Sequence, residues 1–513
     1  MKIQIIDWLF KNNRLRYGLM VLIFLAGLGI RLFDLDDLPL DFHPTRQLFT
    51  AIIARGYYYQ MMPHAPSFER TRAIQQFLAE EKEPPSIDWL AAVTYRLVGR
   101  IDLWYPRFYS VLFWLAGGIA VYWIAKTLTS PAGGILSLGF YLFAPYGIIA
   151  SRSFQPDPMM TSLTLFAWAC MLRWARDRGW KWAIAAGVLA GAAMMVKALA
   201  VFTVLGGMLA AILMRGFKPP VRSSLRQTIL DPQMWVMALV AAAPVVAWTI
   251  YGFWGNGSLG VQFALRFFPN LWIDPVFYLR LQRMIERVTG LLPFFMALLG
   301  WFFFRSRQER LFTVGLWVGY LMFVFVFAYY SATHSYYHIA LVPIAAITLA
   351  PFGQIFAEKI SESGMKMQTK AGLALILLIG TLSLLWSVRD TLHKANYRGQ
   401  DRFWAHLGEV IRHDGRTVAL TQDYGFRLAY WGWTTPVYWP YGGDLALRQL
   451  AGHQLPSFQH QFAQLTANNN YFLVTDLEEF HRQRQLKEML EANYPVFSKG
   501  EGYIIYNLRE SKR

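Results

Sequence analysis

The stretch YGLMVLIFLAGLGIRLF at residues 17–33 decides the fold class of this chain. It is almost entirely apolar and follows a basic N-terminal segment. No small-residue cleavage site comes after it, because the chain continues directly into the acidic sequence DLDDLPLD at residues 34–41. A basic segment before an uncleaved apolar run predicts a first membrane span whose N-terminus is cytoplasmic.

The composition extends this prediction to the whole chain. Of its 513 residues, 55% are hydrophobic and only 16% are charged, whereas a soluble protein carries about 25% charged residues. A membrane span needs roughly 20 apolar residues, and many such runs occur here. The sequence therefore predicts a mainly α, polytopic transmembrane protein with about 11 spans. The expected spans are residues 17–33, 106–125, 131–149, 158–174, 181–196, 198–214, 233–254, 288–304, 311–330, 336–352 and 371–388.

The distribution of charge sets the expected orientation. The net charge is +17, but Lys and Arg cluster in short loops between apolar runs. This pattern is typical of topology signals and anionic headgroups, so we expect no nucleic-acid partner. The positive-inside rule and the number of spans predict a multi-pass membrane protein with a cytoplasmic N-terminus and its C-terminal part outside the cytoplasm. The single cysteine, Cys170, excludes an intrachain disulfide.

Three expected outer segments are too long to be simple connectors. Residues 34–105 contain two amphipathic stretches, at 45–56 and 87–98, which we expect to be helices lying along the membrane surface. Residues 255–287 mix Gly, Asn and aromatic residues, which suits a mobile loop that gates substrate entry. In residues 391–513, strand-like and helix-like stretches alternate, as in a small α/β domain. We therefore expect a membrane domain at 1–390 and an extracytoplasmic domain at 391–513.

Residues with useful chemistry gather at the expected outer boundary. Charged groups at membrane depth are costly, so they tend to mark functional sites that face a polar cavity. We expect the side chains below to converge in one outer pocket. The candidates are Asp41, His43, Arg46, Glu83, Asp88, Arg152, Asp157, Lys197, His334, Tyr336, Tyr337 and His338.

The order of these motifs resembles a known family. An Asp in the first outer loop is followed by a surface helix, an acid-Pro-Pro sequence at 83–85, a second surface helix, Pro-Asp at 156–157 and then Lys197. This order resembles the GT-C glycosyltransferases, and within them the dolichyl-phosphate-mannose protein mannosyltransferase and aminoarabinose-transferase-like branch. The resemblance covers about residues 15–390. The family commonly has an acidic pair in the first loop, whereas here Phe42 follows Asp41.

The resemblance implies an enzyme that uses a polyprenyl-phosphate sugar as donor and inverts the anomeric carbon. It implies a hexosyl- or pentosyltransferase acting on a hydroxyl acceptor, which can be a lipid, a glycan or a protein. Asp41 is positioned to be the catalytic base. Arg46, Arg152 and Lys197 are candidates for the donor phosphate, which gains negative charge as it leaves. Asp157, the second catalytic candidate, can orient Asp41, hold a cation or bind the acceptor.

The other candidates have less defined roles. Glu83, Asp88, Tyr336 and Tyr337 are predicted to contact substrate. A divalent cation is possible, because metal-ligand residue types are expected on the same face. Their spacing matches no compact metal motif, so no cofactor is certain. The candidate metal ligands are His43, Glu83, His334 and His338.

Simpler interpretations and other functions stay open at this point. Asp157 lies in Pro-Asp-Pro and can cap a helix, Lys197 can extend its charge to the interface, and Glu83 and Asp88 can flank the start of a surface helix. A flippase or transporter for lipid-linked sugars is one alternative, although no inverted repeat is evident. A noncatalytic scaffold that binds such lipids is another, because Phe42 replaces the second acid.

Overall fold

The computed structural model describes residues 13–80, 84–217, 221–255, 266–362 and 367–512. Contacts between Cα atoms divide the chain into two compact units. We call the first the helical unit, formed by residues 13–35, 84–87 and 107–394. The second, the sheet unit, is formed by residues 36–80, 88–106 and 395–512. Most of the expected first outer loop therefore belongs to the same unit as the C-terminal part of the chain.

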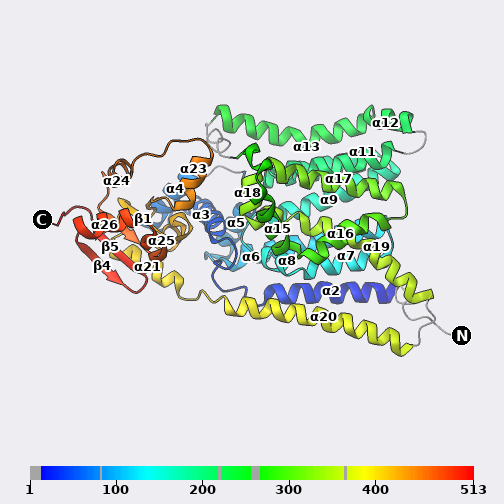
Figure 1. Ribbon diagram of the computed structural model, residues 1–513, viewed down its shortest axis with the longest axis horizontal. Helices are drawn as coiled ribbons and strands as arrows, with labels where there is room; N and C mark the ends of the chain where they lie inside the picture. The colour runs from blue at the N-terminus through cyan, green and yellow to red at the C-terminus, as the bar shows by residue number, and fades with distance from the viewer. Residues whose placement is uncertain (1–12, 81–83, 218–220, 256–265, 363–366, 513) are drawn as a thin grey trace. The chain divides into compact units, whose positions relative to one another are not determined.

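The helical unit has the helices of a polytopic membrane protein (Figure 1). Within the described residues, six helical stretches are long and apolar enough to span a membrane, or seven if a pair bent by 89° forms one span. The polytopic helical prediction is confirmed, but the number 11 is not. The six are α2 (Asn13–Leu32), α6 (Trp104–Leu128), Pro232–Trp254, α17 (Arg307–Val326), Ser335–Glu362 and Gln368–Lys394, and the bent pair is Pro275–Thr289 with Leu291–Phe303.

Shorter helices account for most of the remaining expected spans. Three are apolar but only 10–17 residues long, namely α7 (Pro131–Phe143), α10 (Trp180–Val196) and α11 (Ala200–Gly216). The other elements of this unit are α8 (Pro145–Ala150), α9 (Asp157–Asp177), α12 (Val221–Ile229), α13 (Pro232–Ile250), η1 (Tyr251–Gly255), η2 (Pro269–Ile273), α15 (Pro275–Thr289), α16 (Leu291–Gly300), η3 (Trp301–Phe303), α18 (Ala328–Thr333), η4 (Ser335–His338), α19 (Leu341–Glu362) and α20 (Met367–Lys394).

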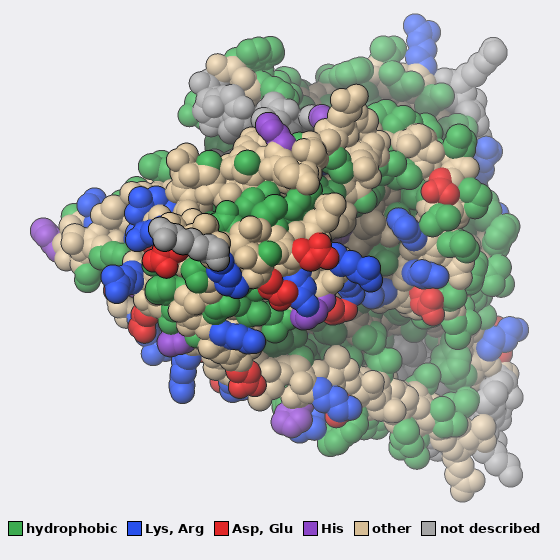
Figure 2. Space-filling model, turned by 60° about the vertical axis from the view of Figure 1, so that its left-hand side comes forward, with side chains coloured by type: hydrophobic (Ala, Val, Ile, Leu, Met, Phe, Trp, Pro, Cys, Tyr) green, Lys and Arg blue, Asp and Glu red, His purple; other side chains and the backbone are tan. Residues whose placement is uncertain are grey.

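The surface of the helical unit is suited to lipid. Large hydrophobic side chains such as Leu22, Leu239 and Ile376 are about two-thirds exposed, at 64%, 67% and 66%. The space-filling view shows hydrophobic side chains over much of the surface (Figure 2). A soluble protein rarely exposes contiguous apolar patches of this kind, so these side chains indicate a surface that contacts the bilayer.

Glycines allow two helices of this unit to pack with their backbones close together. A Cβ added to Gly319 of α17 would lie 2.6 Å from the Cα of Gly206 in α11. One added to Gly315 would lie 2.2 Å from the backbone nitrogen of Ala210. Small residues at helix interfaces are typical of membrane proteins, where association depends on close packing.

The expected outer loop contains three helices that lie mainly in the sheet unit, α3 (Pro44–Gln60), α4 (Ser67–Glu80) and α5 (Ile87–Val98). The two amphipathic helices are thus present where the sequence predicted them. The apolar face of α3 does not lie free on a membrane, however. Leu48 is fully buried, Ile52 is 1% exposed and Ile53 is 6% exposed, because α4 and the helix α22 (Phe426–Trp431) pack against α3.

The C-terminal residues form the predicted α/β fold around a five-stranded sheet of order β2-β1-β3-β5-β4. Strand β1 pairs in parallel with β2 and β3, whereas β5 pairs antiparallel with β3 and β4. The strands are β1 (Thr417–Leu420), β2 (Val437–Tyr438), β3 (Tyr471–Val474), β4 (Val496–Gly500) and β5 (Tyr503–Asn507). The accompanying helices are α21 (Gln400–Val410), η5 (Gln422–Gly425), α22, α23 (Gly442–Leu450), α24 (Phe458–Thr466), α25 (Leu477–Arg482) and α26 (Arg484–Asn493).

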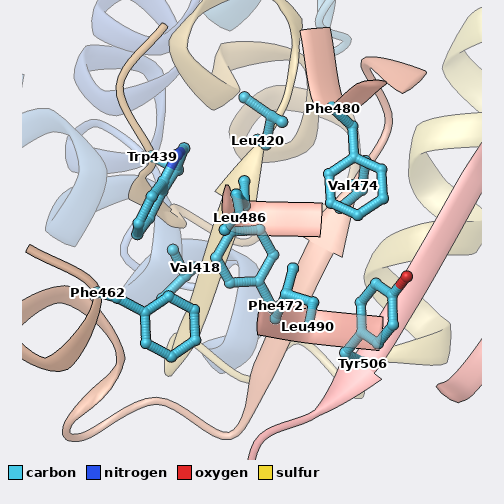
Figure 3. Packing of buried hydrophobic residues seen from close by; sticks show 10 residues of the cluster. All are labelled: Val418, Leu420, Trp439, Phe462, Phe472, Val474, Phe480, Leu486, Leu490 and Tyr506. Atoms are coloured by element: carbon cyan, nitrogen blue, oxygen red, sulfur yellow. The ribbon is translucent and has the colours of Figure 1, made fainter. Parts of the chain in front are cut away.

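One face of this sheet has a compact aromatic and aliphatic core. Val418 and Phe472 of the two central strands are fully buried, and Trp439 is 1% exposed. Leu486 and Leu490, on α26, cover the same face (Figure 3). Both positions are apolar and four residues apart, so they lie on one side of that helix.

A buried arginine fixes α3 to the C-terminal residues within the sheet unit. Arg55 donates hydrogen bonds to the backbone oxygens of Tyr430 and Ala429 and to Gln76 Oε1. Its guanidinium carbon lies 4.0 Å from the ring centroid of Trp433. Burial lowers the pKa of Arg55 to about 10, which leaves it charged at neutral pH. The first loop is therefore part of the folded sheet unit rather than a separate surface segment.

Candidate functional site

The helical unit contains a buried ion pair between two of the predicted site residues. The Nζ of Lys197 lies 2.8 Å from Asp157 Oδ1 and 3.0 Å from Oδ2. The Asp157 side chain is 4% exposed and the Lys197 side chain 10% exposed. Because both charges are largely removed from water, each depends on the other for compensation.

Local structure explains why these two residues can meet. Asp157 is the first residue of α9, after Pro156. Lys197 lies at the break between α10 and α11, where the backbone is extended at φ −157° and ψ 116°. The alternative interpretation of Asp157 as a helix cap is wrong, since Pro156 occupies the N-cap position and no side-chain cap bond forms. The carboxylate binds the ammonium group of Lys197 instead.

Two predicted tyrosines flank the lysine. The Nζ of Lys197 lies 5.1 Å from the ring centroid of Tyr336 and 5.7 Å from that of Tyr337. Both tyrosines belong to the 3-10 turn η4. A cation over an aromatic face is stabilised by the ring quadrupole. The structure therefore joins Asp157, Lys197, Tyr336 and Tyr337 in one cluster.

Histidines close to this cluster are engaged in other contacts. The Nδ1 of His338 lies 2.7 Å from the hydroxyl of Tyr320, and its Nε2 lies 2.6 Å from the backbone oxygen of Ser331. The Nδ1 of His334 lies 2.7 Å from Thr333 Oγ1. Since both ring nitrogens of His338 have partners, metal binding there would require these contacts to break.

Arg152 is placed to support the start of the first loop. Its side chain is 1% exposed and donates to the backbone oxygen of Asp34 over 2.6 Å. Arg107 donates in turn to the backbone oxygen of Arg152 and to that of Leu35, over 3.0 and 2.9 Å. This network gives Arg152 a structural role alongside the phosphate-binding role predicted for it.

In the sheet unit, Asp41 lies just before α3, and His43 and Arg46 follow it. His43 adopts a left-handed conformation at φ 45° and occupies the N-cap of α3. Its ring packs edge-on against Phe42 at 4.6 Å. The guanidinium carbon of Arg46 lies 4.9 Å from the ring centroid of Phe49. Phe42, which stands where the family commonly has an acid, is 8% exposed and part of the core.

A C-terminal residue brings a further acid to this part of the unit. Thr45 Oγ1 donates to Asp423 Oδ1 over 3.0 Å, across 378 positions in the sequence. Asp423 also pairs with Arg427, at 2.5 Å. Burial raises the pKa of Tyr397, and the negative charge of Asp41 raises it further. Sequence reasoning missed Asp423, Arg427 and Tyr397, because nothing local in the sequence connects them with the first loop.

Tyrosines and carboxylates also gather after strands β1, β2 and β3. The Tyr424 hydroxyl donates to Asp444 Oδ1 over 3.0 Å, and the Tyr438 hydroxyl donates to Oδ2 over 2.6 Å. The Tyr441 hydroxyl donates to Asp476 Oδ2 over 2.8 Å. The sequence analysis identified no functional residue in this domain, and the cluster forms only when three separate strand ends meet.

Asp88 and Glu83 are the remaining predicted site residues. Asp88 is 8% exposed and lies in the first turn of α5, while Glu83 is outside the described residues. Among the residues that the structure describes, no group of three or more His, Cys, Asp or Glu side chains could hold a metal ion. The divalent cation therefore stays a prediction.

Comparisons with known proteins agree with this architecture. Residues 82–248 match the family described as dolichyl-phosphate-mannose-protein mannosyltransferase. That segment contains both Asp157 and Lys197. No curated protein matches the sequence.

Solved structures with a similar fold include ArnT and archaeal oligosaccharyltransferase structures. ArnT from Cupriavidus metallidurans bound to undecaprenyl phosphate has a TM-score of 0.57 and 14% identity, with 95% of this chain and 98% of that chain covered. The oligosaccharyltransferase AglB from Archaeoglobus fulgidus, in complex with an inhibitory peptide and a dolichol-phosphate, has a TM-score of 0.56 and 11% identity, with 97% and 74% covered. The Archaeoglobus fulgidus oligosaccharyltransferase tethered with an acceptor peptide has a TM-score of 0.58 and 11% identity, with 98% and 74% covered.

The fold and the family match together define the class of this protein. It is a polytopic membrane protein with a GT-C-like fold. The resemblance to the GT-C glycosyltransferases is confirmed for the fold, and residues 82–248 carry the likeness to the mannosyltransferase family.

Proposed function

We propose that this protein is an inverting glycosyltransferase. In this proposal it moves a hexose or pentose from a polyprenyl-phosphate carrier to a hydroxyl acceptor at the outer face of the bacterial inner membrane. The N-terminus is cytoplasmic and the sheet unit extracytoplasmic, as the basic loops favour. Two structural relatives, bound to undecaprenyl phosphate and to dolichol-phosphate, support a lipid-phosphate donor.

The observation that carries the proposal is the buried Asp157–Lys197 pair inside the segment that matches the family. A buried lysine provides positive charge where a phosphate leaving group gains negative charge. Asp157 holds the ammonium group in place between the two oxygens of its carboxylate. In our proposal Lys197 contacts the donor phosphate, Asp157 positions Lys197, and Tyr336 and Tyr337 line the binding site. Arg46 and Arg152 are further proposed phosphate ligands.

The proposed chemistry is a single displacement. The acceptor oxygen attacks the anomeric carbon, its proton passes to the carboxylate of Asp41, and the bond from the anomeric carbon to the phosphate oxygen breaks. The electron pair of that bond leaves with the phosphate. Attack opposite the leaving group inverts the configuration. Asp41 precedes the family-matched segment, so its role rests on its place in the first outer loop.

The role of Asp41 can be tested by substitution. Asp41→Asn keeps the size of the side chain but removes its capacity to take a proton. Because general-base catalysis contributes about 10²–10⁴-fold, we expect transfer from a polyprenyl-phosphate sugar to fall by at least about a hundredfold, while the variant keeps its thermal stability.

Asp36→Asn is the matched control. Asp36 lies in the same loop, its side chain is 73% exposed, and it pairs with Arg398 at 3.3 Å. We expect this variant to transfer sugar at the rate of the unmodified protein. Near-normal transfer by Asp41→Asn would remove Asp41 from the catalytic role.

A further inference from the structure

We propose that the sheet unit has a saccharide-binding subsite at the ends of strands β1 and β2, formed by Tyr424, Tyr438, Tyr441 and Asp444. This inference rests on the proposed function and gives the acceptor a chemical class, a sugar that presents hydroxyl groups.

The subsite lies at the edge of the sheet where parallel strands end. Tyr424 follows β1 in the turn η5, Tyr441 and Asp444 follow β2, and Asp476 follows β3. Because β2, β1 and β3 are neighbouring parallel strands, their carboxyl ends share one edge. In open α/β sheets, ligands bind outside the carboxyl ends of the strands.

The rings of the three tyrosines lie next to one another, tilted by 44° and 35°. The ring centroids of Tyr424 and Tyr438 are 4.8 Å apart, and those of Tyr438 and Tyr441 are 6.0 Å apart. Tyr424 is 51% exposed. Aromatic faces carry partial negative charge and attract the positively polarised C–H groups that one face of a sugar ring presents.

The hydrogen bonds within the cluster favour a ligand that donates hydrogen bonds to it. Each phenol has one proton, and those of Tyr424 and Tyr438 go to the two oxygens of Asp444. Burial and the hydrogen bond to Asp444 raise the pKa of Tyr438, so it stays protonated. A phenol oxygen has two lone pairs. That of Tyr438 accepts one hydrogen bond, from the backbone N–H of Tyr441 over 3.3 Å, and its second lone pair is the proposed acceptor for a sugar hydroxyl. The same carboxylates would repel phosphate or an acidic peptide.

The backbone at this edge is held in a conformation that is uncommon for residues with side chains. Consecutive residues Asp423 and Tyr424 have φ values of 52° and 55°. Such conformations are energetically costly and cluster at functional sites. Asp423 accepts a hydrogen bond from Thr45 of α3. The turn that contains Tyr424 therefore also contacts the first loop, to which Asp41 belongs.

The experiment measures saccharide binding by the full-length protein in detergent, with no donor present. Saturation-transfer NMR is recorded with a panel of neutral trisaccharides, namely maltotriose, cellotriose, mannotriose and chitotriose, and with a Ser/Thr-containing hexapeptide. We expect at least one trisaccharide to bind, and to bind about tenfold more weakly to Tyr424→Ala and to Asp444→Asn.

Phe497→Ala is the matched control. Phe497 is 43% exposed and lies on β4, the outer strand at the other end of the strand order from β2. This variant should bind like the unmodified protein. Tyr424→Phe, which keeps the ring but loses the hydroxyl, should fall between Tyr424→Ala and the unmodified protein. Thermal unfolding confirms that each variant is folded.

Three results would overturn the inference. These are binding of no trisaccharide, binding that Tyr424→Ala and Asp444→Asn leave unchanged, and binding of the hexapeptide alone that these variants abolish. Since the assay needs no turnover, loss of the proposed transfer activity would not affect its outcome. The two proposals can therefore fail separately.

Discussion

At the scale of single residues, the Asp157–Lys197 pair is the feature on which the helical-unit site depends. Both residues stood among the candidates because charge near membrane depth is costly, but their pairing could not be predicted from sequence. They are 40 positions apart, and a helix cap and an interfacial lysine explained them equally well. The contact of Asp423 with Thr45 was still harder to predict, since it spans 378 positions in the sequence. Contacts of this range depend on the packing of whole elements.

A double-mutant cycle tests whether the pair acts as a unit. Lys197→Met leaves the Asp157 carboxylate buried without its partner, so we expect the free energy of unfolding to fall by about 3–5 kcal/mol. Asp157→Asn should have a similar effect, because it leaves the lysine uncompensated. The double variant should be more stable than the sum of the two losses predicts. Denaturation in detergent measures this, and additive losses would show that the pair is not coupled.

At the scale of elements, segments with an apolar pattern were predictable, whereas exposed segments and the two-residue strand β2 were not. The helix at 87–98 and the strands at 417–420 and 471–474 follow from apolar patterns in the sequence. Strand β2 has only two residues, Val437–Tyr438, which is too short for any period to be visible. Strand β4, Val496–Gly500, is largely exposed and so lacks an apolar signature. The apolar face of α3 was predictable, but the partner that covers it was not.

The close packing of α11 and α17 gives a prediction at this scale. Gly319→Leu would force a side chain against the backbone of Gly206 and Phe202, each 2.6 Å from the position of the new Cβ. We expect a loss of about 1–3 kcal/mol in the free energy of unfolding, or more if the helices must separate. Gly139→Leu is the control, because nothing lies within 4 Å of a Cβ at Gly139 of α7. Equal thermal stability of the two variants would contradict this account of the helix interface.

At the scale of the whole molecule, the sequence predicted the class of protein but not its division into units. Composition alone established a polytopic helical membrane protein, because apolar runs of membrane length are unmistakable. The number of spans was less certain, since α7, α10 and α11 are shorter than a typical span. The grouping of residues 36–80 and 88–106 with the C-terminal sheet depends on long-range contacts such as those of Arg55. Sequence patterns do not encode such contacts directly.

The most direct test of the central claim follows the fate of a lipid-linked sugar. Purified full-length protein is placed in liposomes with labelled polyprenyl-phosphate sugars and a panel of hydroxyl acceptors. We expect release of polyprenyl phosphate together with a product whose anomeric configuration is opposite to that of the donor. Movement of intact donor across the bilayer without its consumption would indicate a flippase, and binding without turnover would indicate a scaffold. Either result would contradict the proposal that this protein is a glycosyltransferase.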